Sequence, residues 1–116
     1  MTSPLLFQPL TLRGLTVRNR AWLPPMCQYA VDSQDGIPST WHLIHYGSFA
    51  VGGFGLIVAE ATAVSPEGRI SPCDTGLWND AQVAAWRTIT DAVHELGGTI
   101  ADQLGHAGRK ASTEKW

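Results

Sequence analysis

The chain has 116 residues, of which 44% are hydrophobic and 16% are charged, and its formal net charge is -2. A nucleic-acid binder needs a basic surface that neutralises phosphates, so this balance excludes that class. The charged fraction lies below the roughly 25% of an average soluble domain. Because a small chain exposes much of its surface, the shortage of charge indicates that part of this surface is covered by something else.

Two further classes are excluded. The longest apolar stretch, residues 56–59, is far shorter than the ~20 residues that span a bilayer, so we expect no membrane segment. The N-terminus lacks the basic region and apolar core of a secretory signal. The two cysteines, Cys27 and Cys73, do not make a disulfide framework, and we therefore expect a reducing, cytoplasmic location.

The first elements expected are a ribbon and a short strand. Residues 5–17 alternate apolar and polar side chains around Arg13-Gly14, which predicts a two-stranded ribbon that turns at Gly14. Residues 21–23 read as a buried strand. That strand must end at Pro24-Pro25, because proline cannot donate a ladder hydrogen bond.

Helices and strands then alternate. A helix is expected over residues 41–51, capped by Ser39 or Thr40, and a strand buried on both faces over residues 54–64. A polar loop covers residues 65–77. A second helix follows over residues 81–96, capped by Asn79 or Asp80, and a third strand over residues 99–104.

This order predicts an α/β fold with a parallel sheet and right-handed crossovers. Three parallel strands are too few for a flavodoxin-like domain, and a (β/α)8 barrel needs about 250 residues. We therefore interpret the chain as the first part of a larger domain. The alternative is a free-standing three-stranded sandwich.

Three clusters of polar side chains fall where parallel strands end, namely residues 24–29, 60–64 and 103–110. Functional loops lie at this end of such sheets, so we expect the clusters to converge. Each also has a plain interpretation. Cys27 is a small buried hydrophobe, and Glu60 is a hydrogen-bond partner whose pKa burial would shift. Gln103 is a buried amide that needs partners, which a heterocycle with an imide edge would supply.

His42 and His45 lie three residues apart on the first expected helix. This spacing suits a metal ion, but no carboxylate or cysteine accompanies it at ligand spacing, so we expect no metal site.

Together these motifs resemble the Old Yellow Enzyme family of FMN-dependent ene-reductases, in the thermophilic-like branch that includes the xenobiotic reductases. The resemblance covers essentially the whole chain, and its strongest piece is the sequence Gln-Leu-Gly-His-Ala-Gly-Arg-Lys at residues 103–110. Other matching stretches are residues 6–12, 17–20, 25–29, 41–48, 55–64, 68–71 and 76–78. It implies that residues 1–116 form the N-terminal hairpin and the first β/α units of an incomplete TIM barrel, the hairpin capping the barrel bottom.

The resemblance also implies residue roles. Ala61 would offer its main-chain amide to FMN, and Gln103 would bond the pyrimidine edge of the ring. Cys27 would tune the flavin and touch substrate, and Tyr29 would form a wall of the substrate pocket. The cofactor-binding residues implied are Pro24, Pro25, Met26, Cys27, Ala61 and Gln103, and the catalytic ones are Cys27 and Tyr29.

The implied reaction passes hydride from NAD(P)H through FMN to the β-carbon of an activated alkene, such as an enone or a maleimide. In this family the groups that grip the substrate carbonyl, donate the proton and hold the FMN phosphate lie further along the barrel. We therefore expect that this chain alone binds FMN weakly or not at all. The remainder of the barrel would come from a second chain or a further segment, and the complete protein would be a homo-oligomer.

Two other functions stay open at this point. The chain could be a non-catalytic fragment or half-barrel assembly module, or, more remotely, a zinc-dependent hydrolase. One residue departs from the family pattern: Asp102 stands where an apolar or small residue is usual. Strand alternation places it opposite Gln103, toward the helices, where an unpaired carboxylate would be costly.

Overall fold

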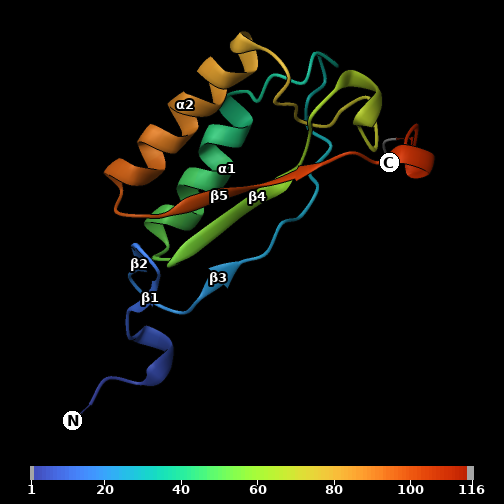
Figure 1. The fold of residues 1–116 in the computed structure, drawn as a ribbon. Helices are drawn as coiled ribbons and strands as arrows, with labels where there is room; N and C mark the ends of the chain where they lie inside the picture. The colour runs from blue at the N-terminus through green and yellow to red at the C-terminus, as the bar shows by residue number, and fades with distance from the viewer. Residues whose placement is uncertain (1, 115–116) are drawn as a thin grey trace.

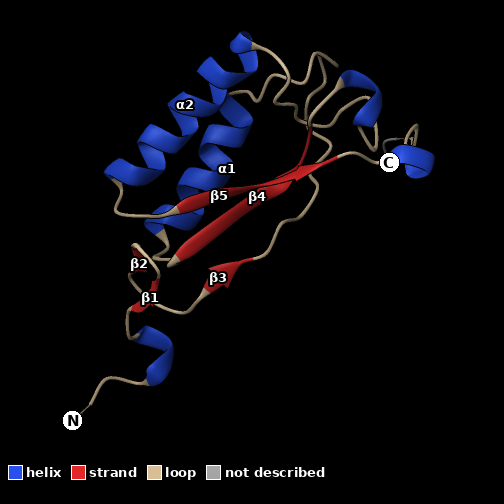
Figure 2. Cartoon of the chain, in the orientation of Figure 1, coloured by secondary structure: helices blue, strands red, loops and turns tan. Residues whose placement is uncertain are grey.

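The computed structural model describes residues 2–114. An antiparallel ribbon, β1-β2, precedes a parallel sheet with strand order β3-β4-β5, and both helices pack on one face of that sheet (Figures 1 and 2). Within these residues no helix has the length and apolar character needed to cross a membrane. The elements are η1 (Leu5–Phe7), β1 (Leu10–Leu12), β2 (Leu15–Val17), β3 (Trp22–Leu23), α1 (Thr40–Val51), β4 (Leu56–Ala63), η2 (Pro66–Gly68), α2 (Asp80–Glu95), β5 (Ile100–Gly105) and η3 (Gly108–Lys110).

The order predicted from the sequence is confirmed: ribbon, strand, helix, strand, helix, strand. The ribbon turns at Arg13-Gly14 and pairs Leu10 with Val17. β3 pairs with β4, and β4 with β5, in parallel. The connections through α1 and α2 are what parallel neighbours require.

Both helices begin with a capping box. At α1, Ser39 Oγ accepts a hydrogen bond from Trp41 N (3.2 Å), and His42 Nδ1 accepts one from Ser39 N (3.0 Å). At α2, Asn79 Oδ1 accepts from Gln82 N (3.0 Å), and Gln82 Oε1 accepts from Asn79 N (3.2 Å). These bonds pair main-chain N–H groups that a helix start otherwise leaves open. Of the alternative caps predicted, Ser39 and Asn79 are the ones used.

The core lies between the sheet and the two helices. Its buried members are Leu23, Tyr46, Ala50, Ile57, Ala59, Trp86, Ile89 and Val93. The other face of the sheet is open over the described residues, since Ala101 and Gln103, which alternate with the core-facing side chains of β5, are both exposed. Parallel sheets normally have both faces covered, so the open face marks where this fold needs a partner.

Arg18 fastens the ribbon to the amino end of the sheet. Its guanidinium donates to Phe54 O (3.1 Å), just before β4, to Ala50 O (2.7 Å) in the last turn of α1, and to Leu96 O (3.3 Å), the C-cap of α2. A cation at a helix C-terminus also interacts favourably with the helix dipole. One side chain therefore joins both helices and the central strand.

We expect Arg18→Ala to lower the free energy of unfolding by about 2 kcal/mol, because hydrogen bonds from a charged donor to three main-chain carbonyls are lost together. Urea unfolding followed by circular dichroism measures this change. Arg87→Ala, which removes an exposed arginine from α2, is the matched control and should change stability by less than about 0.5 kcal/mol. Equal losses of stability in the two variants would contradict the role of Arg18 in joining the helices to the sheet.

Candidate functional site

The carboxyl ends of the three parallel strands meet at one edge of the sheet, as predicted. The loop after β4 folds back on the strand, since Ala63 N donates to Thr75 O (3.0 Å). Val64 N donates to Gly105 O (3.2 Å) and joins the ends of β4 and β5. Val31 N donates to Cys73 O (3.1 Å), which ties the segment after β3 to the same loop.

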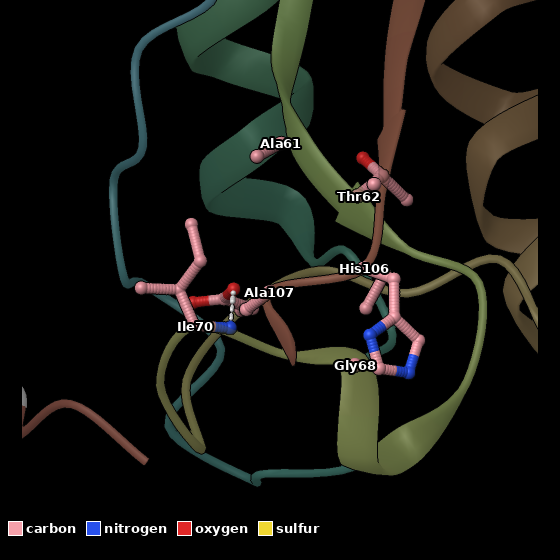
Figure 3. A pocket seen from close by; sticks show the side chains of 9 residues that line it. Ala61, Thr62, Gly68, Ile70, His106 and Ala107 are labelled. Atoms are coloured by element: carbon pink, nitrogen blue, oxygen red, sulfur yellow. Dashed lines mark hydrogen bonds between the residues drawn. The ribbon is translucent and has the colours of Figure 1, made fainter. Parts of the chain in front are cut away.

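A cavity of about 130 Å³ opens between the ends of β4 and β5 (Figure 3). Ala61 lines it from β4, Ile70 from the loop that follows, and His106 from the segment after β5. The loop is held closed by the buried carboxylate of Asp74, which accepts hydrogen bonds from Ile70 N (2.7 Å, dashed in Figure 3) and from Ser71 N and Oγ (3.1 and 2.9 Å). Asp74 thus shapes one wall of the cavity.

A β-bulge in β4 decides which side chains face the site. The register pairs Ala59 with Asp102 and then Ala61 with Gln103, so Glu60 has no partner opposite it. Ala59 and Glu60 both face the helices, since Ala59 belongs to the core and Glu60 bonds Tyr46 of α1. A bulge residue shifts the alternation by one. The shift turns Ala61 to the open face, beside Gln103.

The thiol of Cys27 lies between Tyr29 and Ala61. It shares a hydrogen bond with the Tyr29 hydroxyl and receives one from the Ala61 main chain. Tyr29 has φ = 52°, in the left-handed region that non-glycine residues rarely occupy. Burial raises the pKa of the Cys27 thiol above its ordinary value, and the two hydrogen bonds only partly oppose this effect.

A buried polar network lies behind this thiol. Tyr46 Oη donates to Glu60 Oε2 (2.5 Å) and accepts from Glu60 N (3.0 Å). The Gln28 main-chain N–H also bonds the Glu60 carboxyl. His42 Nε2 lies 3.8 Å from Glu60 Oε1, while its Nδ1 accepts from the Ser39 main chain. Side chains from α1 thus reach through β4 to the segment that carries Cys27.

Burial shifts the titration of this network. Desolvation raises the pKa of Glu60 to about 7, although hydrogen bonds from Tyr46 and Gln28 oppose the shift. Desolvation lowers the pKa of His42 to about 4, with a smaller contribution from His45. Burial and the nearby Glu60 charge raise the pKa of Tyr46. Around neutral pH the histidine is therefore uncharged, and Glu60 is the group that titrates.

The predicted site residues occupy one region, with differing exposure. Cys27 interacts with both Tyr29 and Ala61, and Ala61 pairs with Gln103. Pro24 and Met26 are exposed and Pro25 is half-buried, all between β3 and Cys27. The expectation that Gln103 is a buried amide was wrong for this chain. The amide is exposed because no described residue covers that face of β5.

Three residues of this region were missed by the sequence-based prediction: Gln28, Tyr46 and Asp74. For Tyr46 a signal was present, because it lies one turn after His42 and so shares its helix face with a polar residue. The expectation that burial shifts the pKa of Glu60 is confirmed.

The two histidines of α1 do not converge. His42 is fully buried beside Glu60, whereas His45 stacks on Trp41 with ring centroids 4.7 Å apart. Within residues 2–114 no group of three or more His, Cys, Asp or Glu side chains is arranged to hold a metal ion.

Asp102 points toward the helices, as strand alternation predicted. Its Oδ1 accepts a hydrogen bond from Thr62 Oγ1 (2.7 Å), so the carboxylate has the partner that its position requires. Its Oδ2 is buried with no partner among the described residues, and burial raises the pKa of this carboxyl. It lines a cavity of about 180 Å³ together with Trp86 and Thr90 of α2.

The shifted pKa of Glu60 predicts a pH-dependent stability. Between its ordinary pKa of 4.5 and about 7, Glu60 is protonated in the folded state only, so its contribution to stability is lost as the pH rises through that window. Glu60→Gln has no such loss. We expect the difference between the melting temperatures of Glu60→Gln and the parent chain (variant minus parent) to increase as the pH rises across this window, and then to level off.

Thermal unfolding at several pH values between about 4.5 and 8 measures this difference. His42 acts in the opposite sense, because its lowered pKa removes stability as the pH falls below 6.5 toward about 4, so the upper part of the pH range reports Glu60. Glu95→Gln, which removes an exposed carboxylate at the end of α2, is the control. A flat difference for Glu60→Gln would contradict the assigned burial effect.

Comparisons with known proteins agree with this geometry. Residues 5–116 match the NADH:flavin oxidoreductase / NADH oxidase family. The NADPH dehydrogenases of Geobacillus sp. (strain WCH70) and Geobacillus thermodenitrificans are 48% and 49% identical to the chain, over 95% and 92% of its length. The chain covers 32% of each, so it spans about a third of these relatives.

Solved structures show the same fold. The old yellow enzyme from Trypanosoma cruzi superposes with a TM-score of 0.86 at 41% identity, over 93% of this chain and 28% of that one. Morphinone reductase superposes with a TM-score of 0.85 at 40% identity, over 95% and 28%. The sheet and its helices are therefore the N-terminal part of a (β/α)8 barrel, and the resemblance to Old Yellow Enzyme is confirmed. The chain belongs to the NADH:flavin oxidoreductase / NADH oxidase family.

Proposed function

We propose that this chain supplies the N-terminal part of the flavin and substrate site of an FMN-dependent ene-reductase driven by NAD(P)H. The observation that carries the proposal is the meeting of Cys27, Tyr29 and Ala61 at the carboxyl end of the sheet, beside the exposed amide of Gln103. Family membership supports the redox chemistry, and the names of the relatives support NADPH as a reductant.

The residues present fit a flavin. Ala61 and Gln103 lie side by side on the open face, and the methyl side chain of Ala61 allows a flat ring to approach the strand. The Gln103 amide offers two N–H donors and one acceptor oxygen, which complement the imide edge of an isoalloxazine. A Cβ built on Gly105, two residues further, would meet open space. The donor set therefore matches the cofactor that the family implies.

Each residue has a specific part in this proposal. Pro24, Pro25 and Met26 form the stiff strand end along which the ring would lie, Ala61 contacts it through the main chain, and Gln103 bonds its pyrimidine edge. Bound FMN would supply hydride transfer from NAD(P)H to an activated alkene, such as an enone or a maleimide.

Two side chains would face the reacting partners. Cys27 presents a polarizable thiol whose hydrogen bonds affect the electronics of a neighbouring ring. Tyr29 supplies an aromatic wall that orients a planar substrate.

The remainder of the barrel must supply the other strands, the phosphate site and the proton donor. The open sheet face supports this requirement, and we propose that the complete protein is a homo-oligomer. The same face also favours a second candidate function, that of a non-catalytic assembly module. The free thiols of Cys27 and Cys73 support a reducing, cytoplasmic location.

Reconstitution tests the proposal. We define the completed barrel as the Geobacillus sp. NADPH dehydrogenase in which residues 1–116 of this chain replace the matched third. We expect the isolated chain to purify without flavin, because the sheet face that carries Gln103 is open to water. The completed barrel should bind FMN, show flavin absorption bands and reduce an enone with NADPH. Absence of flavin from the completed barrel would contradict the proposed function and favour the assembly module, whereas stoichiometric flavin on the isolated chain would contradict its incompleteness.

Gln103 provides a sharper test within the completed barrel. Gln103→Leu should weaken FMN binding by about tenfold, since the loss of hydrogen bonds to one ring edge costs about 1.4 kcal/mol. Fluorescence titration with FMN measures the dissociation constant. Asp102→Asn is the control, because the neighbouring residue faces the helices and an amide oxygen still accepts from Thr62. Unchanged FMN affinity in Gln103→Leu would contradict the role of Gln103.

A further inference from the structure

The bulge in β4 depends on one phenol group. A bulge residue drops out of the ladder, which leaves the Glu60 main-chain N–H without a strand partner in a buried place. Tyr46 Oη accepts that N–H (3.0 Å) and donates its own proton to Glu60 Oε2 (2.5 Å). Tyr46 therefore clamps both the main chain and the side chain of the same residue, and fixes the bulge from the helix side.

The Glu60 carboxyl also holds the segment that follows β3. It accepts the Gln28 main-chain N–H, and Gln28 directly follows Cys27. On the β4 side, the residue after Glu60 is Ala61, whose main chain bonds the Cys27 thiol. Cys27 and Gln28 are adjacent in one segment, and Glu60 and Ala61 are adjacent in β4. The Cys27–Ala61 and Gln28–Glu60 contacts therefore lie next to each other between the same two segments. Two adjacent bonds of this kind fix both position and orientation.

We propose that Glu60, held by Tyr46, is a positioning residue that sets the Cys27 thiol against Ala61 at the face where the flavin would lie. The importance of this contact for catalysis rests on the proposed function. The contact itself concerns residues of this chain alone. Glu60 touches neither open face nor cavity, since it keeps only 2% of its surface, and so it acts through its neighbours.

The surroundings of Glu60 explain why a carboxyl group is needed there. A carboxylate presents an acceptor oxygen at both of its positions, whereas a glutamine places at one of them an NH2 group, which only donates. The titratable groups that face Glu60 are Tyr46 and His42 from α1, Asp74 from the loop after β4, Asp102 from β5, and Cys27 from the segment after β3.

The rate of Cys27 alkylation reports how well its segment is held in place, and it can be measured without any cofactor. Iodoacetamide is applied to the 116-residue chain and to the completed barrel, and modification is followed by mass spectrometry of tryptic peptides. Arg69 separates the peptide of Cys27 from that of Cys73, so the two thiols are read independently. The variants are Glu60→Gln, Glu60→Ala and Tyr46→Phe, with Ile89→Val as a control that changes the same core but removes no hydrogen bond of the network.

We expect Glu60→Gln and Tyr46→Phe to speed alkylation of Cys27 by at least about threefold, because a released segment opens more often and exposes its thiol. Glu60→Gln should do so above pH 7 as well, where the stability of the variant relative to the parent is expected to be at its highest. A merely structural role would make thiol reactivity follow stability. Ile89→Val, less stable, should leave the rate unchanged. Tyr46→Phe separates position from charge, because it retains the Glu60 carboxyl.

Three outcomes would overturn the proposal. The first is an unchanged rate of Cys27 alkylation in both Glu60→Gln and Tyr46→Phe, and the second is acceleration in Glu60→Gln alone, which would assign the effect to charge. The third is equal acceleration in Ile89→Val. Glu60→Ala repeats the first variant with full truncation, and if it does not fold, Glu60→Gln decides. In the completed barrel, the two supporting variants should also shift the flavin absorption maximum. If the parent completed barrel binds no FMN, the proposed function fails while the thiol result still decides this inference.

Discussion

Two hydrogen bonds between Tyr46 and Glu60 connect the helix layer to the mouth of the sheet. They act at a point where β4 departs from regular geometry, and both Glu60 groups involved would otherwise be buried without a strand partner. The free-energy cost of leaving a buried polar group without a hydrogen bond is a large fraction of the free energy of unfolding of a small domain. The bulge is therefore retained as long as the phenol is present, and the placement of Ala61 beside Gln103 depends on it.

The two ends of the sheet have different physical character. At the amino end, Arg18 joins two helix C-termini and the start of β4 through main-chain carbonyls. At the carboxyl end, loops are tied by Asp74, by main-chain bonds and by the Glu60 network, and a cavity remains between them. This division, with stability at one end and chemistry at the other, is typical of (β/α)8 barrels.

Much of this architecture could be predicted because it is local. The apolar run of β4, the side chains of Ser39 and Asn79 at the helix starts and the prolines after β3 each determine an element within a few residues. Alternation also placed Asp102 correctly. The roles of Cys27, Tyr29 and Gln103 came instead from resemblance and remain predictions.

The bulge could not be predicted, because it depends on Tyr46, which lies 14 residues away along the chain. Regular alternation would have put Ala61 on the same face as Ala59, toward the helices. The exposure of Gln103 was missed for a related reason: burial depends on what covers a strand, and the strand sequence alone does not contain that information. Non-local contacts therefore account for both differences.

The open sheet face also has a kinetic consequence. Ala101 and Gln103 stay in contact with water until further strands are added, and an unpaired strand edge is a template for any exposed strand nearby. Pairing between separate copies is bimolecular and accelerates with protein concentration, whereas pairing with strands on the same polypeptide does not. Dilute conditions and covalent continuity should thus favour the closed barrel over aggregation of its first third.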